Sequence, residues 1–546
     1  MQGSGGARLP RRATESAHVR SSAAPLLRSP PSALRRADAL PLAYYAAAVA
    51  TGILVSACFL RFQLFPLAWV AFVPLLWTLR RAHSTRDAVR VGLVAGVVTN
   101  LPAFYWLVYT INSFGGFSYP IALFVYLCLT LFASCQFVLF AVAWRRSGPG
   151  PLGLAAPIVW VSLEFLFPNL FLWRMANCQF HVPVLMQIGD ITGPFGLSFV
   201  MLWVSAGIAE RIDRPQRDRR RLLPLGAALM ATFALVLYGV IRLPQIDHLM
   251  QSAPSVRVAL VQGNVGIREK GDTRYFDINV GKYQQLSEGV QDNVDVLVWP
   301  ETVDQHWVSA EMTRLEGKDN PFEGLRRHLI FGGLAFRLRS SDPDDADEFN
   351  SAFLMEPGGV LLDRYDKRIL MPFGEYVPFA SAIPFIKKIV PVPGGFTPGD
   401  RVSVFDIGGK AKIGQLICYE DISAGMPRYT TQAGAEVLLN ILNDAWYGNT
   451  VAPYQHQALA LWRAIENRRY LLRGSNSGVT SIIDAAGRIV AEGGLFTSEV
   501  VIGTVPRLQL MSFYTRYGDV FAWLTVAAAL ALLVKGRDSQ PNLLSS

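Results

Sequence analysis

The stretch GQLICYEDI, residues 414–422, ends an apolar run with Cys418 and continues at once with Tyr419, Glu420 and Asp421. The run has the character of a buried strand, so the thiol falls where the strand ends. A cysteine in a strand is more often inert packing than a nucleophile. Its role therefore depends on which other residues the fold brings to the same edge.

The region around this stretch reads as a soluble α/β domain, residues 243–515. Its strand-like runs are VRVALVQGN (256–264), VDVLVWPE (294–301), LIFGGLAF (329–336), KIGQLICYE (412–420), EVLLNIL (436–442) and VTSIIDAAG (479–487). Helix-like segments, among them YFDINVGKYQQLSEGV and YQHQALALWRAIENRRYLL, separate several of these runs. Such alternation predicts helices packed over sheets.

The composition indicates that much of the remaining chain lies in lipid. Hydrophobic residues make up 51% of the 546 residues and charged residues only 17%. A soluble protein averages about 25% charged residues. The mean hydropathy is +0.28, which agrees with this deficit of charge.

Apolar segments long enough to cross a bilayer predict a membrane domain over residues 41–242. Seven spans are expected, at about 41–60, 63–79, 88–110, 118–143, 151–168, 192–210 and 222–242, and an eighth near 518–535. The mixed stretch 169–191 predicts a loop or an interfacial segment. Residues 516–546 would then hold the eighth helix and a short cytoplasmic tail.

The distribution of charge predicts the topology. Residues 1–242 contain 22 arginines, no lysine and eight acidic residues, and the arginines cluster in alternate loops. By the positive-inside rule these loops and the Arg-rich, disordered tail 1–40 are cytoplasmic, and residues 243–515 face outward into the periplasm. Charge asymmetry can also indicate nucleic-acid binding, but the sequence has no aromatic-basic motif for it.

The cysteines predict neither a metal site nor a disulfide within the polar domain. No CxxC or Cys/His ligand spacing occurs. Cys58, Cys128, Cys135 and Cys178 lie in or beside apolar segments, which leaves Cys418 alone in the polar region. No cofactor is implied.

Polar residues of complementary chemistry recur at the ends of the predicted strands and turns. They are Glu301 in VWPET, Lys367 and Glu375 in RYDKRILMPFGEYVPF, Cys418 in LICYED, and Asn443, Asp444 and Trp446 in LNDAWYGNT. A thiol attacks a carbonyl as its thiolate, a carboxylate can remove the proton, and a cation can stabilise the oxyanion. One residue of each type suffices for acyl transfer through a thioester.

These blocks carry a family resemblance. VWPET, YDKRILMPFGEYVPF and LICYEDI resemble the three signature blocks of the nitrilase, or carbon–nitrogen hydrolase, superfamily. LMPFGEYVPF, LNDAWYG and YTRYGD, together with the multispan arrangement, resemble its membrane branch, the apolipoprotein N-acyltransferases. The resemblance covers residues 41–535. It implies a multispan α-helical membrane domain joined to an α-β-β-α sandwich with a Glu-Lys-Cys triad.

The resemblance also implies roles for eight residues. Glu301 would be the general base, Lys367 the oxyanion stabiliser and Cys418 the nucleophile. Glu375 and Glu420 would orient the lysine and tune the proton balance, the Tyr419 N–H would be a second oxyanion donor, and Trp446 and Arg469 would lie near the active-site opening. Two departures from the family pattern bear on substrate placement rather than on the triad. They are Gly271 after Lys270 and the absence of proline after Glu301-Thr302-Val303, the stretch that matches ETA in the family.

The reaction that the resemblance implies has two lipid-anchored substrates. An acyl chain passes from a membrane phospholipid to Cys418 and then to the α-amine of a diacylglyceryl-cysteine at a lipoprotein N-terminus. Reaction at the bilayer avoids exposing acyl chain to water, which costs about 0.8 kcal/mol per CH₂. The segment 378–396, with Lys387 and Lys388, is a candidate lid or an ordinary surface loop. A monomer is expected.

Three other interpretations use the same sequence. In a membrane-tethered amidase or hydrolase, water would resolve the thioester. A non-catalytic membrane scaffold would have no reactive cysteine. A transporter is disfavoured because the predicted spans hold few ionisable residues, Glu164 being one.

Overall fold

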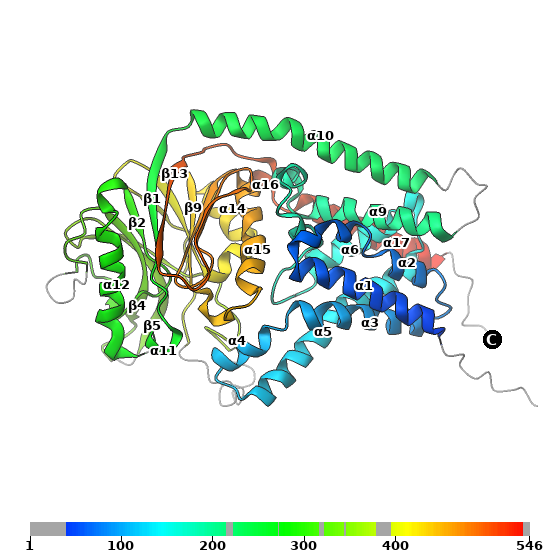
Figure 1. Ribbon diagram of the computed structural model, residues 1–546, viewed down its shortest axis with the longest axis horizontal. Coiled ribbons are helices and arrows are strands. Elements are labelled where there is room, and N and C mark those ends of the chain that lie inside the picture. The colour runs from blue at the N-terminus through cyan, green and yellow to red at the C-terminus, as the bar shows by residue number, and fades with distance from the viewer. Residues whose placement is uncertain are drawn as a thin grey trace, which may run out of the picture. The chain divides into compact units, whose positions relative to one another are not determined.

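The computed structural model describes residues 40–213, 222–270, 272–315, 322–342, 345–377 and 395–538. The Arg-rich tail 1–39, Gly271 and nearly all of the candidate lid 378–396 lie outside this description. The described chain from Leu42 onward is a helical part followed by a two-sheet part and a final helix (Figure 1).

The helical part follows the predicted apolar segments. Its elements are α1 (Leu42–Leu60), η1 (Phe62–Trp69), α2 (Val73–Leu79), α3 (Thr85–Ala103), α4 (Leu107–Ser113), α5 (Tyr119–Ser147), η2 (Pro151–Gly153), α6 (Ala155–Leu166), η3 (Met175–Gln179), α7 (Pro183–Met186), α8 (Gly189–Thr192), α9 (Phe195–Asp213) and α10 (Leu223–Ser252). The last helix of the chain is α17 (Val520–Asp538). Each apolar segment predicted to span the membrane is thus helical.

Length and composition make several of these helices capable of crossing a bilayer. Among the described residues five such helices occur, or six if α3 and α4 together form one span. The axes of α3 and α4 differ by 57°. Helices α6 and α17 are apolar but shorter. Large apolar side chains such as Phe124, Leu131 and Phe233 are exposed, as expected of surfaces that face lipid. The chain is therefore a multi-pass membrane protein, and the count of eight spans stays a prediction.

Small residues let the membrane helices approach closely. A Cβ added to Gly96 of α3 would lie 2.7 Å from the Ser134 Cβ of α5, so only glycine fits there. Helix α3 begins with a capping box, in which Ser84 accepts from the Asp87 N–H and the Asp87 carboxylate accepts from the Ser84 N–H. The sequence thus determines both where α3 begins and how closely it packs on α5.

The predicted boundary at residues 242–243 lies inside a helix and needs correction. Helix α10 continues through Pro244 to Ser252, and β1 begins three residues later. Hydropathy falls after Arg242, but the polar residues that follow are compatible with a helix. The mixed stretch 169–191 contains only the short elements η3, α7 and α8, which confirms that it is not a long helix.

The second part is a sandwich of two mixed sheets. One sheet has the order β13-β1-β2-β4-β5-β6, with β3 paired to β4, and the other has the order β12-β11-β10-β9-β8-β7. The strands are β1 (Ser255–Gln262), β2 (Val296–Val298), β3 (Asp304–Ser309), β4 (His328–Leu338), β5 (Ala346–Met355), β6 (Leu361–Asp366), β7 (Val404–Asp406), β8 (Lys412–Ile417), β9 (Val437–Leu442), β10 (Tyr470–Ser475), β11 (Ser481–Ile483), β12 (Ile489–Glu492) and β13 (Glu499–Pro506).

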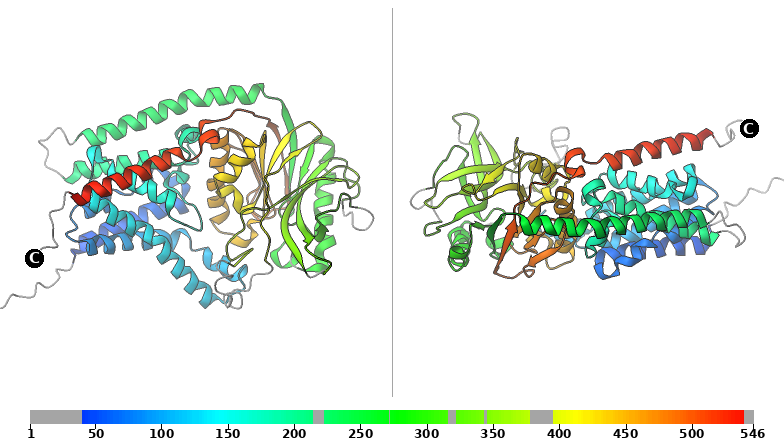
Figure 2. Two further views of the ribbon diagram at one scale, coloured as in Figure 1. Left: turned by 180° about the vertical axis from the view of Figure 1, so that it is seen from behind. Right: turned by 90° about the horizontal axis from the view of Figure 1, so that it is seen from above.

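Helices cover both outer faces of the sandwich, as Figures 1 and 2 show. They are α11 (Ile267–Lys270), α12 (Phe276–Glu288), α14 (Gly425–Gln432), α15 (Ala452–Asn467) and α16 (Phe513–Tyr517), with the short turns η5 (Thr273–Tyr275), η6 (Gln291–Asn293), η8 (Cys418–Ile422) and η9 (Asp444–Tyr447). Helix α12 packs on the first sheet through Tyr283 and Trp299, whose indole N–H donates to Ser287. Helices α14 and α15 pack on the second sheet. The predicted α-β-β-α layering is confirmed.

One predicted helix is too long. The segment 454–472 is helical only to Asn467, and Tyr470 begins β10. Arg468 ends the helix in a left-handed conformation, with φ +50° and ψ +49°. The arginines there continue a helical pattern of polar residues, so periodicity alone does not reveal the turn.

Candidate active site

Cys418 is the first residue of the short helix η8, which follows β8 directly. We call residues 418–422 the Cys418 turn. The backbone of Cys418 has φ +51°, a left-handed conformation that is uncommon for residues with a side chain. Asn440 of β9 donates to the Cys418 carbonyl oxygen at 3.0 Å. Sharp strand-to-helix turns of this kind present a reactive side chain beyond the end of a sheet.

Lys367 follows β6 and lies between two buried carboxylates. Its Nζ donates to Glu301 Oε1 at 3.3 Å and to Glu375 Oε1 at 2.9 Å. Lys367 is 2% exposed and each glutamate 7%. Burial alone would lower the pKa of Lys367, but the charges of Glu375 and Glu301 outweigh burial and raise that pKa well above its usual value. The ammonium group stays charged at neutral pH.

Asn350 of β5 joins the two carboxylates from the other side. Its Nδ2 donates to Glu301 Oε1 at 2.8 Å and to Glu375 Oε1 at 2.9 Å. The backbone carbonyl oxygen of Asn350 accepts from the backbone N–H of Lys367 at 2.9 Å. The sequence does not predict this role of Asn350, because an asparagine in an ordinary strand carries no motif.

A second buried lysine contacts the same cluster. Lys270 Nζ donates to the Glu301 backbone oxygen at 2.6 Å. Burial lowers the pKa of Lys270 to about 8, although the charges of Glu301 and Cys418 act to raise it. The sequence singled out this lysine only as a neighbour of Gly271.

The environment of Cys418 favours the thiol over the thiolate. Burial raises the pKa of the Cys418 thiol well above its usual range, Glu301 adds to the rise, and Lys367 opposes it. The predicted Glu301, Lys367 and Cys418 therefore lie within electrostatic reach of one another. Because the thiol is protonated at neutral pH, its attack on a carbonyl requires a base.

Glu420 holds the Cys418 turn to residues 367–375 after β6, which we call the lysine loop. Its carboxylate accepts from the Arg368 N–H at 2.7 Å, the Ile369 N–H at 3.0 Å and the Ile417 N–H at 2.8 Å. The Tyr365 hydroxyl also donates to it, at 2.8 Å. Glu375 thus contacts the Lys367 side chain directly. Glu420 instead accepts from backbone N–H groups that follow Lys367 and from the one that precedes Cys418.

Residues of the helical part contact the Cys418 turn. The Tyr419 hydroxyl donates to the Leu170 backbone oxygen, and the Tyr419 ring lies 6.4 Å from that of Phe171. The Trp446 ring is half-buried and packs edge-on against Phe114 of the membrane part, with centroids 4.4 Å apart. The cysteine therefore lies on the side of the sandwich that meets the membrane helices.

Phe114 also closes over the lysine loop. A Cβ added to Gly374, the neighbour of Glu375, would lie 2.4 Å from Phe114 Cε1. The one ring of Phe114 thus separates Trp446 from the loop that carries Glu375. The position of Trp446 near an opening stays a prediction.

Arg469 is not at an opening, and its predicted role needs correction. The side chain is 2% exposed. Its guanidinium donates to four backbone oxygens, those of Ala435 at 2.6 Å, Leu510 at 2.7 Å, Arg468 at 3.1 Å and Asn467 at 3.2 Å. A buried guanidinium with this many partners stabilises the chain where α15 ends and contacts no incoming substrate.

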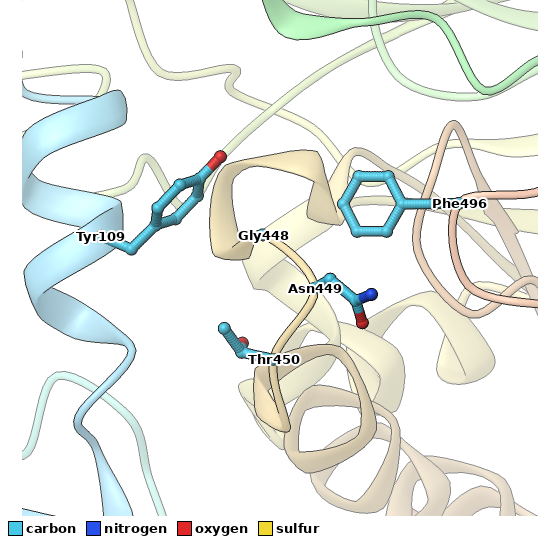
Figure 3. Close-up of a pocket in the computed structure, with 5 residues that line it drawn as sticks. All are labelled: Tyr109, Gly448, Asn449, Thr450 and Phe496. Carbon is cyan, nitrogen blue, oxygen red and sulfur yellow. The ribbon is translucent and has the colours of Figure 1, made fainter.

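A pocket of about 470 Å³ lies beside the site (Figure 3). Tyr109 of α4 borders it on one side, Phe496 on the other, and Gly448, Asn449 and Thr450 lie between them. None of Glu301, Lys367 and Cys418 lines this pocket. One lining residue, Gly448, follows Trp446 by two positions in the sequence.

Comparison with known proteins agrees with this architecture. Residues 257–513 match the family model of the carbon–nitrogen hydrolases. The sandwich is therefore a carbon–nitrogen hydrolase domain carried by a membrane-helix domain. Residues 51–207 match the N-terminal domain of apolipoprotein N-acyltransferases.

Two relatives match over nearly their whole length. The apolipoprotein N-acyltransferase of Geobacter metallireducens is 36% identical over 511 residues, which are 90% of this chain and 95% of that protein. The apolipoprotein N-acyltransferase of Bdellovibrio bacteriovorus is 27% identical, with 89% and 92% covered. The chain belongs to the apolipoprotein N-acyltransferase family.

Two solved structures show a limited likeness to part of the chain. Nit3 of Saccharomyces cerevisiae, from branch 10 of the nitrilase superfamily, has a TM-score of 0.34 and 20% identity, and covers 46% of this chain and 90% of its own. An amidase from Nesterenkonia sp. has a TM-score of 0.34 and 19% identity, with 47% and 92% covered.

Proposed function

We propose that the protein moves a fatty acyl chain from a membrane phospholipid, through a thioester on Cys418, to the α-amine of a lipoprotein's N-terminal diacylglyceryl-cysteine. The observation that carries this proposal is the placement of the Cys418 turn. It joins a carboxylate–ammonium cluster on one side and contacts Leu170 and Phe171 of the membrane part on the other. The family relationship supports the same acyltransferase reaction.

In the first half-reaction Glu301 accepts the thiol proton of Cys418. The sulfur then attacks the ester carbonyl carbon of the phospholipid, and the negative charge moves to the carbonyl oxygen. As the ester C–O bond breaks, the departing alkoxide takes the proton from Glu301. The products are an S-acyl cysteine and a lysophospholipid.

In the second half-reaction the acceptor amine attacks the thioester carbonyl carbon. Glu301 accepts a proton from the attacking nitrogen, and the C–S bond breaks to release an amide. The cysteine sulfur leaves as thiolate and regains its proton from Glu301. Atoms and charge balance without a cofactor, because both steps are acyl transfers.

Lys367 is suited to stabilise the oxyanion of both steps. Its ammonium is fixed between Glu301 and Glu375 before substrate arrives, so little reorganisation is needed during reaction. The Tyr419 N–H, on the residue after the nucleophile, is the proposed second donor. Glu375 and Asn350 hold Lys367 and Glu301 in position relative to each other.

The proposed location is the bacterial inner membrane, with the sandwich in the periplasm. The arginine-rich alternate loops support this orientation through the positive-inside rule. Both substrates are anchored in the outer leaflet of that membrane, so neither has to leave the bilayer.

Intact-mass spectrometry after incubation with phospholipid alone tests the reaction. We expect the wild type to gain one acyl group and Cys418→Ala to gain none. A diacylglyceryl-cysteine peptide should discharge the adduct and become acylated itself. Discharge by water with no gain by the peptide would identify a hydrolase, and an equal adduct on the alanine variant would refute the role of Cys418.

A further inference from the structure

A chain of buried charged groups lies directly behind the Cys418 turn and takes no part in the mechanism above. His456 of α15 is 1% exposed. Its Nε2 lies 2.8 Å from Asp421 Oδ1 and its Nδ1 lies 2.9 Å from Asp444 Oδ1. Carboxylates accept hydrogen bonds and do not donate them when ionised, so both ring nitrogens of His456 donate. The ring is therefore an imidazolium.

A second cation and an amide complete the chain of contacts. Arg473 of β10 donates from Nε to Asp421 Oδ2 at 3.1 Å, and its Nη2 lies 3.9 Å from Asp444 Oδ2. Asn440 donates both to Asp421 and to the Cys418 carbonyl oxygen. Through Asn440 the buried charges reach the backbone of the cysteine itself.

The charges in this cluster balance. Two carboxylates, Asp421 and Asp444, face two cations, His456 and Arg473, and all four side chains are buried. Burial would lower the pKa of His456, but the charges of Asp421 and Asp444 raise it to about 9, against the opposing charge of Arg473. Tyr447 of η9 packs edge-on against the imidazole ring.

The balance matters because the cluster acts on the thiol. Asp444 is among the groups that raise the pKa of Cys418, together with burial, Glu301 and Glu375, whereas Lys367 lowers it. Arg473 alone would balance only one of the two carboxylates. Without the imidazolium, one net negative charge would therefore remain behind a sulfur that has to become an anion.

We propose that His456 is a positioning residue, an imidazolium at neutral pH that, together with Arg473, neutralises Asp421 and Asp444 behind Cys418 and so keeps the thiol able to ionise while Asn440 holds the turn. The proposal rests on the assigned role of Cys418 as nucleophile. It adds a group that neither touches substrate nor exchanges a proton during the cycle.

The test compares the pH dependence of Cys418 alkylation by iodoacetamide, read by mass spectrometry at pH values below the His456 pKa of about 9, in the wild type and two variants. His456→Gln removes a positive charge, so the alkylation profile should move to higher pH by about one unit. Asp444→Asn removes a negative charge, so the profile should move to lower pH. His248→Gln, an exposed histidine of α10, is the matched control and should leave the profile in place.

A purely structural role for His456 predicts a different result. Both variants would then lower the melting temperature and the yield of acyl-enzyme, but their profiles would not move in opposite directions. That outcome, or shifts of the same sign, would overturn the proposal. If His456→Gln does not fold, the alkylation profile of Asp444→Asn still has to move to lower pH. The double variant His456→Gln with Asp444→Asn, which has the same net charge as the wild type, has to return toward the wild-type profile.

The same samples separate this inference from the proposed function. Failure of the wild type to form an acyl adduct with phospholipid would refute the acyl transfer, whatever the alkylation profiles show. Normal acylation with unshifted profiles would refute the role of His456 and leave the acyl transfer intact.

Discussion

Lys367 is the residue on which the charges of the site converge. Its ammonium lies between Glu301 and Glu375 and within reach of the Cys418 sulfur. The same contacts that fix its position also keep it protonated. One side chain therefore serves both the stability of the buried cluster and the electrostatics of the reaction.

Lys367→Met should abolish both contributions. Acyl-enzyme formation should fall at least about 100-fold, because a preorganised oxyanion partner is lost. The free energy of unfolding should fall by about 3–5 kcal/mol, since two carboxylates stay buried without their cation. Intact mass and thermal melting in detergent measure the two effects. Lys412→Met, at an exposed lysine of β8, is the control, and a matching loss there would contradict the argument.

The triad could be predicted from sequence because each member lies in a block of several specific residues. The same was not possible for Asn350, Lys270 and His456. Each lies in an ordinary strand or helix, and its role depends on partners that are distant in the sequence. Arg469 shows the reverse error. Its place in a family pattern suggested an opening, but the fold buries it among backbone carbonyls.

Among the elements, the end of α4 and the lysine loop approach each other too closely for any side chain at Gly374. Gly374→Ala should displace the Phe114 ring and, through it, Trp446 and Glu375. We expect acyl-enzyme formation to fall about tenfold or more, because small misplacements at a reacting centre are costly, with the melting temperature little changed.

The double variant Phe114→Ala with Gly374→Ala tests the cause of that loss. It removes the ring that the new methyl group would strike, so acylation should recover in part. If the double variant is no better than Gly374→Ala alone, the loss does not arise from this contact.

A second junction between elements depends on Asp190 of α8. Its carboxylate accepts from Arg468 at 2.7 Å, from Arg242 of α10 at 2.8 Å and from the Tyr238 hydroxyl at 2.6 Å. Asp190→Asn would leave the buried Arg468 without its anion, which should cost about 3–5 kcal/mol. The readout is thermal melting in detergent. Asp363→Asn, which breaks an exposed pair with Arg401, should cost less than about 1 kcal/mol.

The ends of two helices, α10 and α15, differ from those that the sequence predicts, and the physical reason is similar in both. Hydropathy ends the last helix before the sandwich at Arg242, yet α10 continues to Ser252, because polar residues lower hydropathy without disfavouring a helix. The arginines at 468–469 continue a helical pattern, yet a single left-handed residue ends α15. Backbone conformation at one residue leaves little trace in periodicity.

At the scale of the whole molecule, the alternation of basic loops predicts which surfaces face the periplasm. A cysteine introduced at Asp292, whose side chain is 69% exposed on the sandwich, should react with a membrane-impermeant maleimide added outside spheroplasts. A cysteine at Arg86, which is exposed in the first turn of α3, should react only after the membrane is opened. Labelling in the opposite order would reverse the proposed topology.

Helix α10 has a further consequence. Thirty residues of helix extend about 45 Å, whereas the hydrocarbon core of a bilayer is about 30 Å thick. Only two residues, Ala253 and Pro254, separate this helix from β1 in the first sheet. We expect the part of α10 beyond the hydrocarbon to help set the distance between the Cys418 thiol and the lipid ester groups. A thicker or thinner bilayer would change that distance, so turnover should depend on the chain length of the surrounding lipids as well as on that of the acyl donor.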